Sequence, residues 1–225
     1  MACPVLERPG TDVNGQESTD IWLASPEAAD YFRPHALSSS EAERYAGTRS
    51  TQRRLDFAVS RALRQQVGNG LMQSGLSHSG GYAAVARIGV PAQVGIDLEL
   101  HKPRDILSIA RFAYAAREVA ALQDLPGTER LCAFYSLWTL KEAFAKALQL
   151  PLLDALKNCV FLRERSVLRG ELPTKLVWKA YLFAPRKDLS LAMAVVGSKT
   201  SPRLRMYEWP PVTTADWPQP FEIEF

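Results

Sequence analysis

The sequence has few cysteines: Cys3, Cys132 and Cys159 are the only three among 225 residues. They are odd in number, lie far apart and form no Cys-x-x-Cys or Cys/His cluster. A disulfide-rich secreted domain and a structural zinc site are therefore not expected. A chain of this length buries roughly 70% of the surface that its unfolded form exposes, so its stability requires neither.

Long apolar runs and a strong net charge are also missing. The longest apolar stretches, such as Leu189 to Val196, fall far short of the roughly 18 residues that a membrane span requires. The first twenty residues are polar and lack the apolar segment of a secretory signal. The formal net charge of +3 is too small to indicate a nucleic-acid-binding protein. We expect a cytoplasmic protein that binds neither membranes nor nucleic acids.

A pattern of one helix followed by two strands occurs twice along the chain. Apolar residues spaced three and four apart predict long helices over 48–67 and 128–150. Strands are predicted over 82–87 and 93–100, joined as a hairpin by a Gly-Val-Pro turn, and again over 189–196 and 204–209.

This duplication favours an α+β fold, a pseudo-dimer of two similar halves that each hold a small, mostly antiparallel sheet and packed helices. We place the halves at 1–103 and 104–225, the second ending in a Pro-rich tail. Small ligands usually bind in clefts between domains, so the active site is expected in the cleft between the halves.

The first candidate for chemistry is the strand Gly95-Ile-Asp-Leu-Glu-Leu100. Alternation puts Asp97 and Glu99 on one face, about 7 Å apart, and Ile96 and Leu98 on the other. Two such carboxylates repel each other unless water or a cation lies between them. Mg²⁺ is commonly held by one or two carboxylates together with substrate phosphates. The alternative, a solvent-facing acidic edge, is the commoner explanation of so short a pattern.

The second candidate is the predicted helix that contains Trp138-Thr-Leu-Lys-Glu-Ala-Phe-Ala-Lys146. Glu142 and Lys146 have the spacing of an ordinary surface ion pair. Lys141 falls within the apolar stripe of the helix, where a cation needs a partner or a wet cavity. Whether Lys141 binds a ligand or organises the carboxylates stays open at this point.

The third candidate is Leu76-Ser-His-Ser-Gly-Gly81, which we interpret as a polar turn before a strand. A His flanked by Ser residues could indicate a hydrolase, but no Gly-x-Ser-x-Gly motif accompanies it. The hydroxyls, the imidazole and the flexible backbone would equally suit a phosphate group.

Taken in order, these three motifs resemble the 4′-phosphopantetheinyl transferases of the surfactin-synthetase type. The resemblance extends from about Leu37 to Val196 and includes both signatures, Gly95–Glu99 and Trp138–Lys146. It implies a monomeric pseudo-dimer that uses Mg²⁺ to move 4′-phosphopantetheine from coenzyme A to a serine of an apo acyl or peptidyl carrier protein. The other product is 3′,5′-ADP.

The resemblance also implies a role for each matched residue. Asp97, Glu99 and Glu142 would hold Mg²⁺, and Lys146 would contact the pyrophosphate. Ser77 and His78 would contact coenzyme A phosphates, and Arg53, or Arg54 in an alternative register, would meet the nucleotide. Asp97, Glu142 and Lys146 form the expected catalytic set, with Glu142 or a water on the metal accepting the serine proton.

The chain departs from the family in one segment. The stretch between the first long helix and Ser77 is short and lacks the family's Gly-Lys-Pro, so Arg64 is the candidate to replace its nucleotide contacts. Two alternatives follow: a non-catalytic paralogue that binds a carrier protein or coenzyme A, and a Mg²⁺-dependent nucleotide phosphohydrolase that uses the same carboxylates. The sequence specifies neither the carrier protein nor the pathway.

Overall fold

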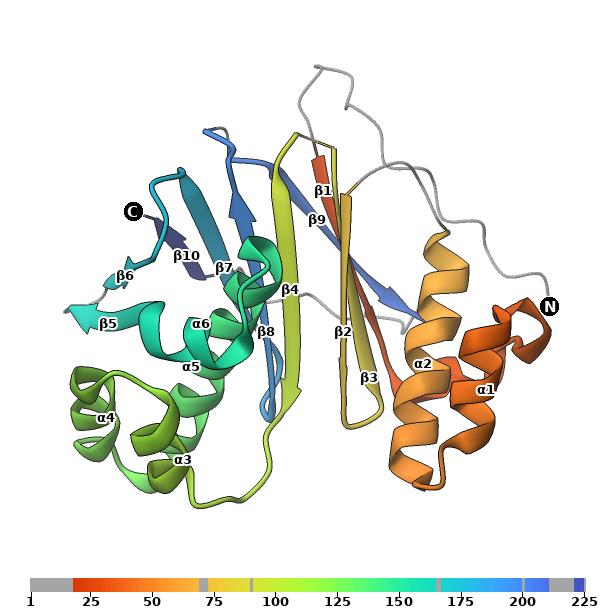
Figure 1. The fold of residues 1–225 in the computed structure, drawn as a ribbon, viewed down its shortest axis with the longest axis horizontal. Coiled ribbons are helices and arrows are strands. Elements are labelled where there is room, and N and C mark those ends of the chain that lie inside the picture. The colour runs from red at the N-terminus through yellow and green to blue at the C-terminus, as the bar shows by residue number, and fades with distance from the viewer. Residues whose placement is uncertain are drawn as a thin grey trace. The chain divides into compact units, whose positions relative to one another are not determined.

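The protein consists of two compact α+β units, as the computed structural model in Figure 1 shows. The structure describes residues 18–68, 73–89, 91–164, 167–199, 201–210 and 221–224. Unit 1 comprises Met1–Val90 with Pro202–Asp216, and unit 2 comprises Pro91–Ser201 with Trp217–Phe225. Small, mostly antiparallel sheets with packed helices confirm the predicted fold class. A site in a cleft between the units stays a prediction.

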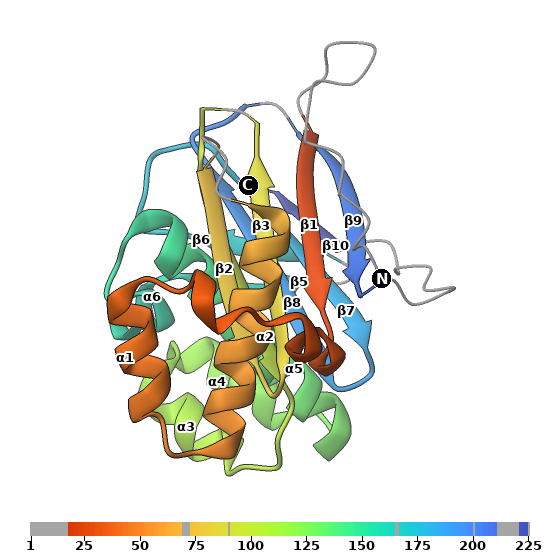
Figure 2. The same cartoon turned by 90° about the vertical axis from the view of Figure 1, so that its right-hand side faces the viewer.

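Unit 1 is built on a four-stranded sheet with the order β2-β3-β1-β9. Its strands are β1 (Ser18–Ala24), β2 (Gln73–Ser79), β3 (Tyr82–Ile88) and β9 (Arg203–Trp209), and only the β1–β9 pair is parallel. The 3₁₀ helices η1 (Pro26–Tyr31) and η2 (Pro34–Ala36) and helix α1 (Ser39–Gly47) precede the long helix α2 (Thr51–Val67). Helix α2 lies against one face of this sheet (Figure 2) and buries Val59 and Leu63 against Trp22 and Val85.

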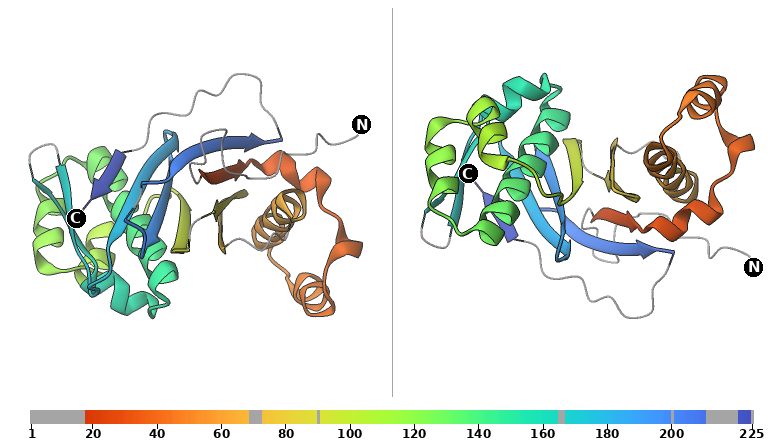
Figure 3. Two further views of the ribbon diagram at one scale, coloured as in Figure 1. Left: turned by 90° about the horizontal axis from the view of Figure 1, so that it is seen from above. Right: turned by 90° about the horizontal axis from the view of Figure 1, so that it is seen from below.

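Unit 2 contains an antiparallel four-stranded sheet with the order β10-β7-β8-β4 and a separate β5–β6 ribbon. The strands are β4 (Gln93–Leu100), β5 (Val160–Glu164), β6 (Val167–Glu171), β7 (Trp178–Arg186), β8 (Leu189–Val196) and β10 (Phe221–Glu224). The helices are α3 (Ile106–Ala113), α4 (Ala116–Gln123), α5 (Gly127–Leu148) and α6 (Leu152–Asn158). Helix α5 packs across β4 and β8, with the other helices on the same side of the sheet (Figure 3).

The pairing of β4 corrects the predicted hairpin. Both edges of β3 are occupied, by β2 and by β1, so β4 cannot add to it. Strand β4 instead pairs with β8, from Gln93↔Val196 to Leu100↔Leu189. The boundary expected after residue 103 placed β4 in the first half and β9 in the second, whereas each strand belongs to the sheet of the other unit. Unit 2 therefore begins before β4, and the chain returns to unit 1 for β9 before it adds β10 to the sheet of unit 2.

The sequence-based prediction also missed elements that carry weak local signals. The segment expected to be a polar turn is mostly strand β2, and only Gly80 and Gly81, with φ of 62° and 90°, form the turn into β3. These backbone angles favour glycine, which explains the pair. Helix α6 was not predicted, and the Pro-rich tail lies beyond residue 210, outside the described residues. Within the described ranges, no helix has the length and apolar character needed to span a bilayer.

Candidate functional site

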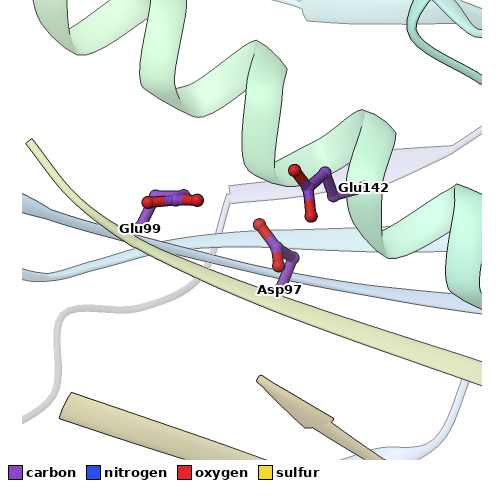
Figure 4. Close-up of side chains that lie close together, drawn as sticks. All are labelled: Asp97, Glu99 and Glu142. Carbon is purple, nitrogen blue, oxygen red and sulfur yellow. The ribbon is translucent and has the colours of Figure 1, made fainter. Parts of the chain in front are cut away.

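Three carboxyl groups from β4 and α5 converge in unit 2. Asp97 and Glu99 come from the strand and Glu142 from the helix, and one carboxylate oxygen of each lies within 4.8 Å of the others. Figure 4 shows the three groups turned toward one another. Asp97 is only 2% exposed, which contradicts the alternative of a solvent-facing acidic edge. Glu142 and Lys146 also do not form an isolated surface ion pair, because the Glu142 carboxyl group faces Asp97 and Glu99.

Gly95 allows the strand to approach the helix this closely. A Cβ atom at residue 95 would lie 1.9 Å from the Ala143 carbonyl oxygen and 2.7 Å from the Ala147 nitrogen. Strand β4 thus lies directly on the backbone of α5, and Asp97 and Glu99 share the helix-facing side of the strand with Gly95. The glycine of the first signature sets the separation between the strand carboxylates and Glu142.

Attractive contacts hold β4 to α5 on both sides of the carboxyl cluster. On one side, Lys146 donates from Nζ to Asp97 Oδ1 (2.7 Å) and to the Ile96 carbonyl oxygen (2.9 Å). On the other side, Tyr135 stacks on His101 with ring centroids 4.7 Å apart. The Tyr135 hydroxyl also accepts a hydrogen bond from the Lys102 N–H and donates to the Lys102 carbonyl oxygen. The strand and the helix are therefore fastened at both ends of the cluster.

The cluster alters the acid–base behaviour of Glu142. Burial, followed by the negative charges of Asp97 and Glu99, raises the pKa of Glu142 to about 7, while Lys146 opposes the rise. A carboxyl group with this pKa can accept or release a proton near neutral pH. The same repulsion makes the cluster a favourable place for a cation.

The donor set fits a hard divalent cation. Carboxylate oxygens are the ligands that Mg²⁺ and Ca²⁺ prefer. One oxygen from each of Asp97, Glu99 and Glu142 lies within 4.8 Å of the others, so the three groups are close enough to surround one ion. The ammonium group of Lys146 lies beside this position and could contact an anionic ligand.

The remaining predicted site residues lie in unit 1. Ser77 and His78 are neighbours on β2, so strand alternation directs their side chains to opposite faces; Ser77 is buried and His78 is exposed. Arg53 is exposed in the first turn of α2, where its N–H bonds to the Ser50 hydroxyl. Arg54, the alternative register, lies over the Tyr45 ring.

Two cavities lie at the other end of α2. One of about 470 Å³ is lined by Ser38, Glu41, Arg61, Arg64 and neighbouring residues. The second, of about 120 Å³, is lined by Arg64, Ser74 and Arg87 among others. Arg64 borders both cavities and lies about 16 Å along the helix axis from Arg53.

A comparison with family models now identifies the region that carries the carboxyl cluster. Residues 93–193 match the model of the 4′-phosphopantetheinyl transferase superfamily. The matched segment is slightly less than half of the chain. It runs from β4 to β8, and so includes Asp97, Glu99, Glu142 and Lys146.

Similar proteins carry names of the same kind. The chain is 30% identical over 148 residues to the 4′-phosphopantetheinyl transferase HetI of Nostoc sp., covering 63% of this chain and 60% of that protein. It is 41% identical over 71 residues to the 4′-phosphopantetheinyl transferase psf-1 of Bacillus pumilus, covering 32% of this chain and 29% of that protein. The chain thus spans less than two thirds of the length of these curated relatives.

One solved structure shows a weaker likeness. A holo-(acyl-carrier-protein) synthase from Bacillus anthracis, in complex with coenzyme A, is 14% identical with a TM-score of 0.42. The match covers 48% of this chain and 96% of that one. A likeness of this size supports no conclusion about the present site.

Gly95→Ala should weaken both the fold and cation binding. The added methyl would force β4 away from α5, at a cost of about 1–3 kcal/mol or more in the free energy of unfolding. Mn²⁺ affinity, measured by titration, should fall with it because Asp97 and Glu99 would move away from Glu142. Gly127→Ala, at the start of α5 where a Cβ meets open space, is the matched control and should change neither. Wild-type stability in Gly95→Ala would contradict the close contact.

Glu142→Gln should stabilise the metal-free protein at high pH. The folded-state pKa of about 7 exceeds the ordinary value of 4.5, so the ionised form destabilises the fold increasingly between these values and fully above pH 7. At pH 8, urea unfolding should show the variant to be more stable by about 1–3 kcal/mol, and most of this gain should vanish at pH 5. Glu129→Gln, on the exposed first turn of α5, is the control. Equal stability of wild type and Glu142→Gln at pH 8 would show that burial and the neighbouring carboxylates do not destabilise the ionised Glu142 side chain.

Proposed function

We propose that this protein is a phosphopantetheinyl transferase of the surfactin-synthetase type, acting as a monomer. It would transfer 4′-phosphopantetheine from coenzyme A to a serine hydroxyl of an apo acyl or peptidyl carrier protein and release 3′,5′-ADP. The observation that carries the proposal is the cluster of Asp97, Glu99 and Glu142 with Lys146 beside it. The cluster lies within the segment that matches the superfamily model.

The metal assignment follows from the chemistry of the ligands. Asp97, Glu99 and Glu142 would hold one Mg²⁺. When bound, the ion would neutralise charge on phosphate oxygens and help to orient the pyrophosphate of coenzyme A. Each of the three residues offers an anionic oxygen of the type that Mg²⁺ binds in proteins.

The protein's own side chains account for the remaining requirements. Transfer forms a bond between the serine Oγ and the phosphorus that carries pantetheine, and breaks the bond from that phosphorus to the oxygen of 3′,5′-ADP. Lys146, held against β4, would place a positive charge beside the pyrophosphate, where negative charge accumulates. The serine proton needs an acceptor, and Glu142 or a water molecule at the cluster would take that role.

The nucleotide end of coenzyme A would be bound by unit 1. Ser77 and His78 are the proposed phosphate contacts and Arg53 is the proposed nucleotide contact. The cavities at the end of α2 support a further contact from Arg64, because an arginine fork matches phosphate oxygens and the larger cavity has the size of a ligand pocket. Arg64 would compensate for the absent Gly-Lys-Pro stretch.

Mass spectrometry of an apo carrier protein tests the transferase directly. Incubation with coenzyme A and Mg²⁺ should add one phosphopantetheine group to the carrier serine. Asp97→Ala and Glu142→Ala should slow this reaction at least 10²–10³-fold, because each removes a group that stabilises charge in the transition state. Glu129→Ala, an exposed acidic change on the same helix as Glu142, should react like the wild type.

The other outcomes distinguish the alternative functions. Binding of the carrier or of coenzyme A without modification would indicate a non-catalytic paralogue. Release of a nucleotide product without carrier modification would indicate a phosphohydrolase. Undiminished transfer in Asp97→Ala or Glu142→Ala would refute the metal assignment while leaving the activity in place. A panel of acyl and peptidyl carriers would define the preferred partner.

Substitutions in unit 1 should act on coenzyme A binding. Arg53→Ala, His78→Ala and Arg64→Ala should each raise KM for coenzyme A roughly tenfold or more with a smaller change in kcat, because phosphate contacts stabilise ground and transition states alike. Dephospho-coenzyme A, which lacks the 3′-phosphate, identifies the residue that contacts that group. An effect of Arg64→Ala combined with none of Arg53→Ala would move the nucleotide contact to the C-terminal end of α2.

A further inference from the structure

Lys141 forms a fully buried ion pair directly behind the carboxyl cluster. Its ammonium group donates to Glu118 Oε2 at 2.7 Å and to the Leu156 carbonyl oxygen at 2.6 Å. The same nitrogen lies 4.4 Å from the centre of the Tyr114 ring. Lys141 and Glu118 are both 0% exposed. The contacts account for a cation within the apolar stripe of α5.

The pair joins α5 to several separate segments of unit 2. Glu118 lies on α4, and its two oxygens also accept hydrogen bonds from the Phe161 N–H of β5 (2.9 Å) and the Ala115 N–H (3.1 Å). Leu156 belongs to α6. The Lys141 head group therefore holds α5 against α4 and α6, and Glu118 extends the connection to the start of β5. These elements lie around Lys141, whereas β4 lies against Glu142.

The carboxyl cluster requires an anchor that holds α5 from the side of α4 and α6. Three carboxylates within 4.8 Å repel one another, and the repulsion pushes α5 away from β4 or turns Glu142 out of the cluster. Glu142 directly follows Lys141, so a rotation or shift of the helix at Lys141 moves Glu142 equally. A buried ion pair contributes little net stability compared with apolar residues, but it can fix one arrangement.

We infer that Lys141 and Glu118 are positioning residues, whose buried ion pair holds α5 so that Glu142 remains within ligand distance of Asp97 and Glu99. The inference rests on the proposed cation site and deepens it. It assigns to Lys141 no contact with coenzyme A or with the reacting atoms. Residues behind metal ligands commonly change metal affinity or activity by 10–100-fold when they are replaced.

The test removes both charges together. Lys141→Met with Glu118→Gln keeps the side-chain lengths and leaves no unpaired buried charge, although either amide orientation leaves one backbone N–H without an acceptor. We expect a folded protein with a slightly lower Tm and Mn²⁺ binding that is 10–100-fold weaker by calorimetric titration. In carrier modification, kcat should fall while KM for coenzyme A stays within about twofold.

The control removes an ion pair in unit 1 whose acid is buried and whose arginine is 33% exposed. Asp20 is 1% exposed and accepts two hydrogen bonds from Arg205, at 2.6 and 3.0 Å. Asp20→Asn with Arg205→Met should lower Tm similarly without changing Mn²⁺ affinity. If the Lys141/Glu118 double variant does not fold, Glu118→Asp, which keeps both charges and shortens the reach of the carboxylate, should show a smaller loss in the same direction.

Each outcome has a definite meaning. Wild-type Mn²⁺ affinity and kcat in a folded Lys141/Glu118 variant would overturn the inference and leave the pair a purely structural feature. Equal losses of Mn²⁺ affinity in the Asp20/Arg205 control would also overturn it, because general destabilisation would then explain both. A wild-type protein that binds Mn²⁺ but modifies no carrier would refute only the proposed function, and the relative affinities would still decide the inference. A wild-type protein that binds no Mn²⁺ would refute the cation site and the inference that rests on it, and carrier modification would still decide the proposed function.

Discussion

The contact between Gly95 and the backbone of α5 is the constraint on which the candidate site depends. A strand with a side chain at that position could not lie where β4 lies, because its Cβ atom would overlap the Ala143 carbonyl group. The helix residues at this contact, Ala143 and Ala147, are also small and are buried. This close packing of small residues brings the carboxylates of Asp97 and Glu99 close to that of Glu142.

The charges around this contact are balanced on two sides of one helix. On the strand side, Lys146 pairs with Asp97 and offsets part of the repulsion that raises the pKa of Glu142. On the other side, Lys141 pairs with Glu118 away from water. Two lysines five residues apart therefore act in different environments. One is partly exposed and able to meet an anion, and the other is enclosed by protein.

The sequence was most informative where the signal is local. The spacing of apolar residues predicted α5 and β8 closely, and strand alternation placed Asp97 and Glu99 on one face. Pairing depends on segments far apart, so the sequence could not show that β4 adds to β8 rather than β3. The sequence likewise showed Lys141 to be a cation within an apolar stripe. It could not identify the partner, Glu118, because that residue lies on another helix. Strand β2 was missed since its Ser and Gly residues have little strand propensity.

The late addition of β9 to the sheet of unit 1 affects how that unit can assemble during synthesis. Strands β1, β2 and β3 leave the ribosome early, but their sheet lacks β9 until residue 209 has been made. At usual elongation rates of 5–20 residues per second, the delay after β3 is roughly ten seconds. During that interval β1 has an unpaired edge, which is a template for incorrect pairing. The first unit to begin is thus completed only when almost the whole chain has been translated.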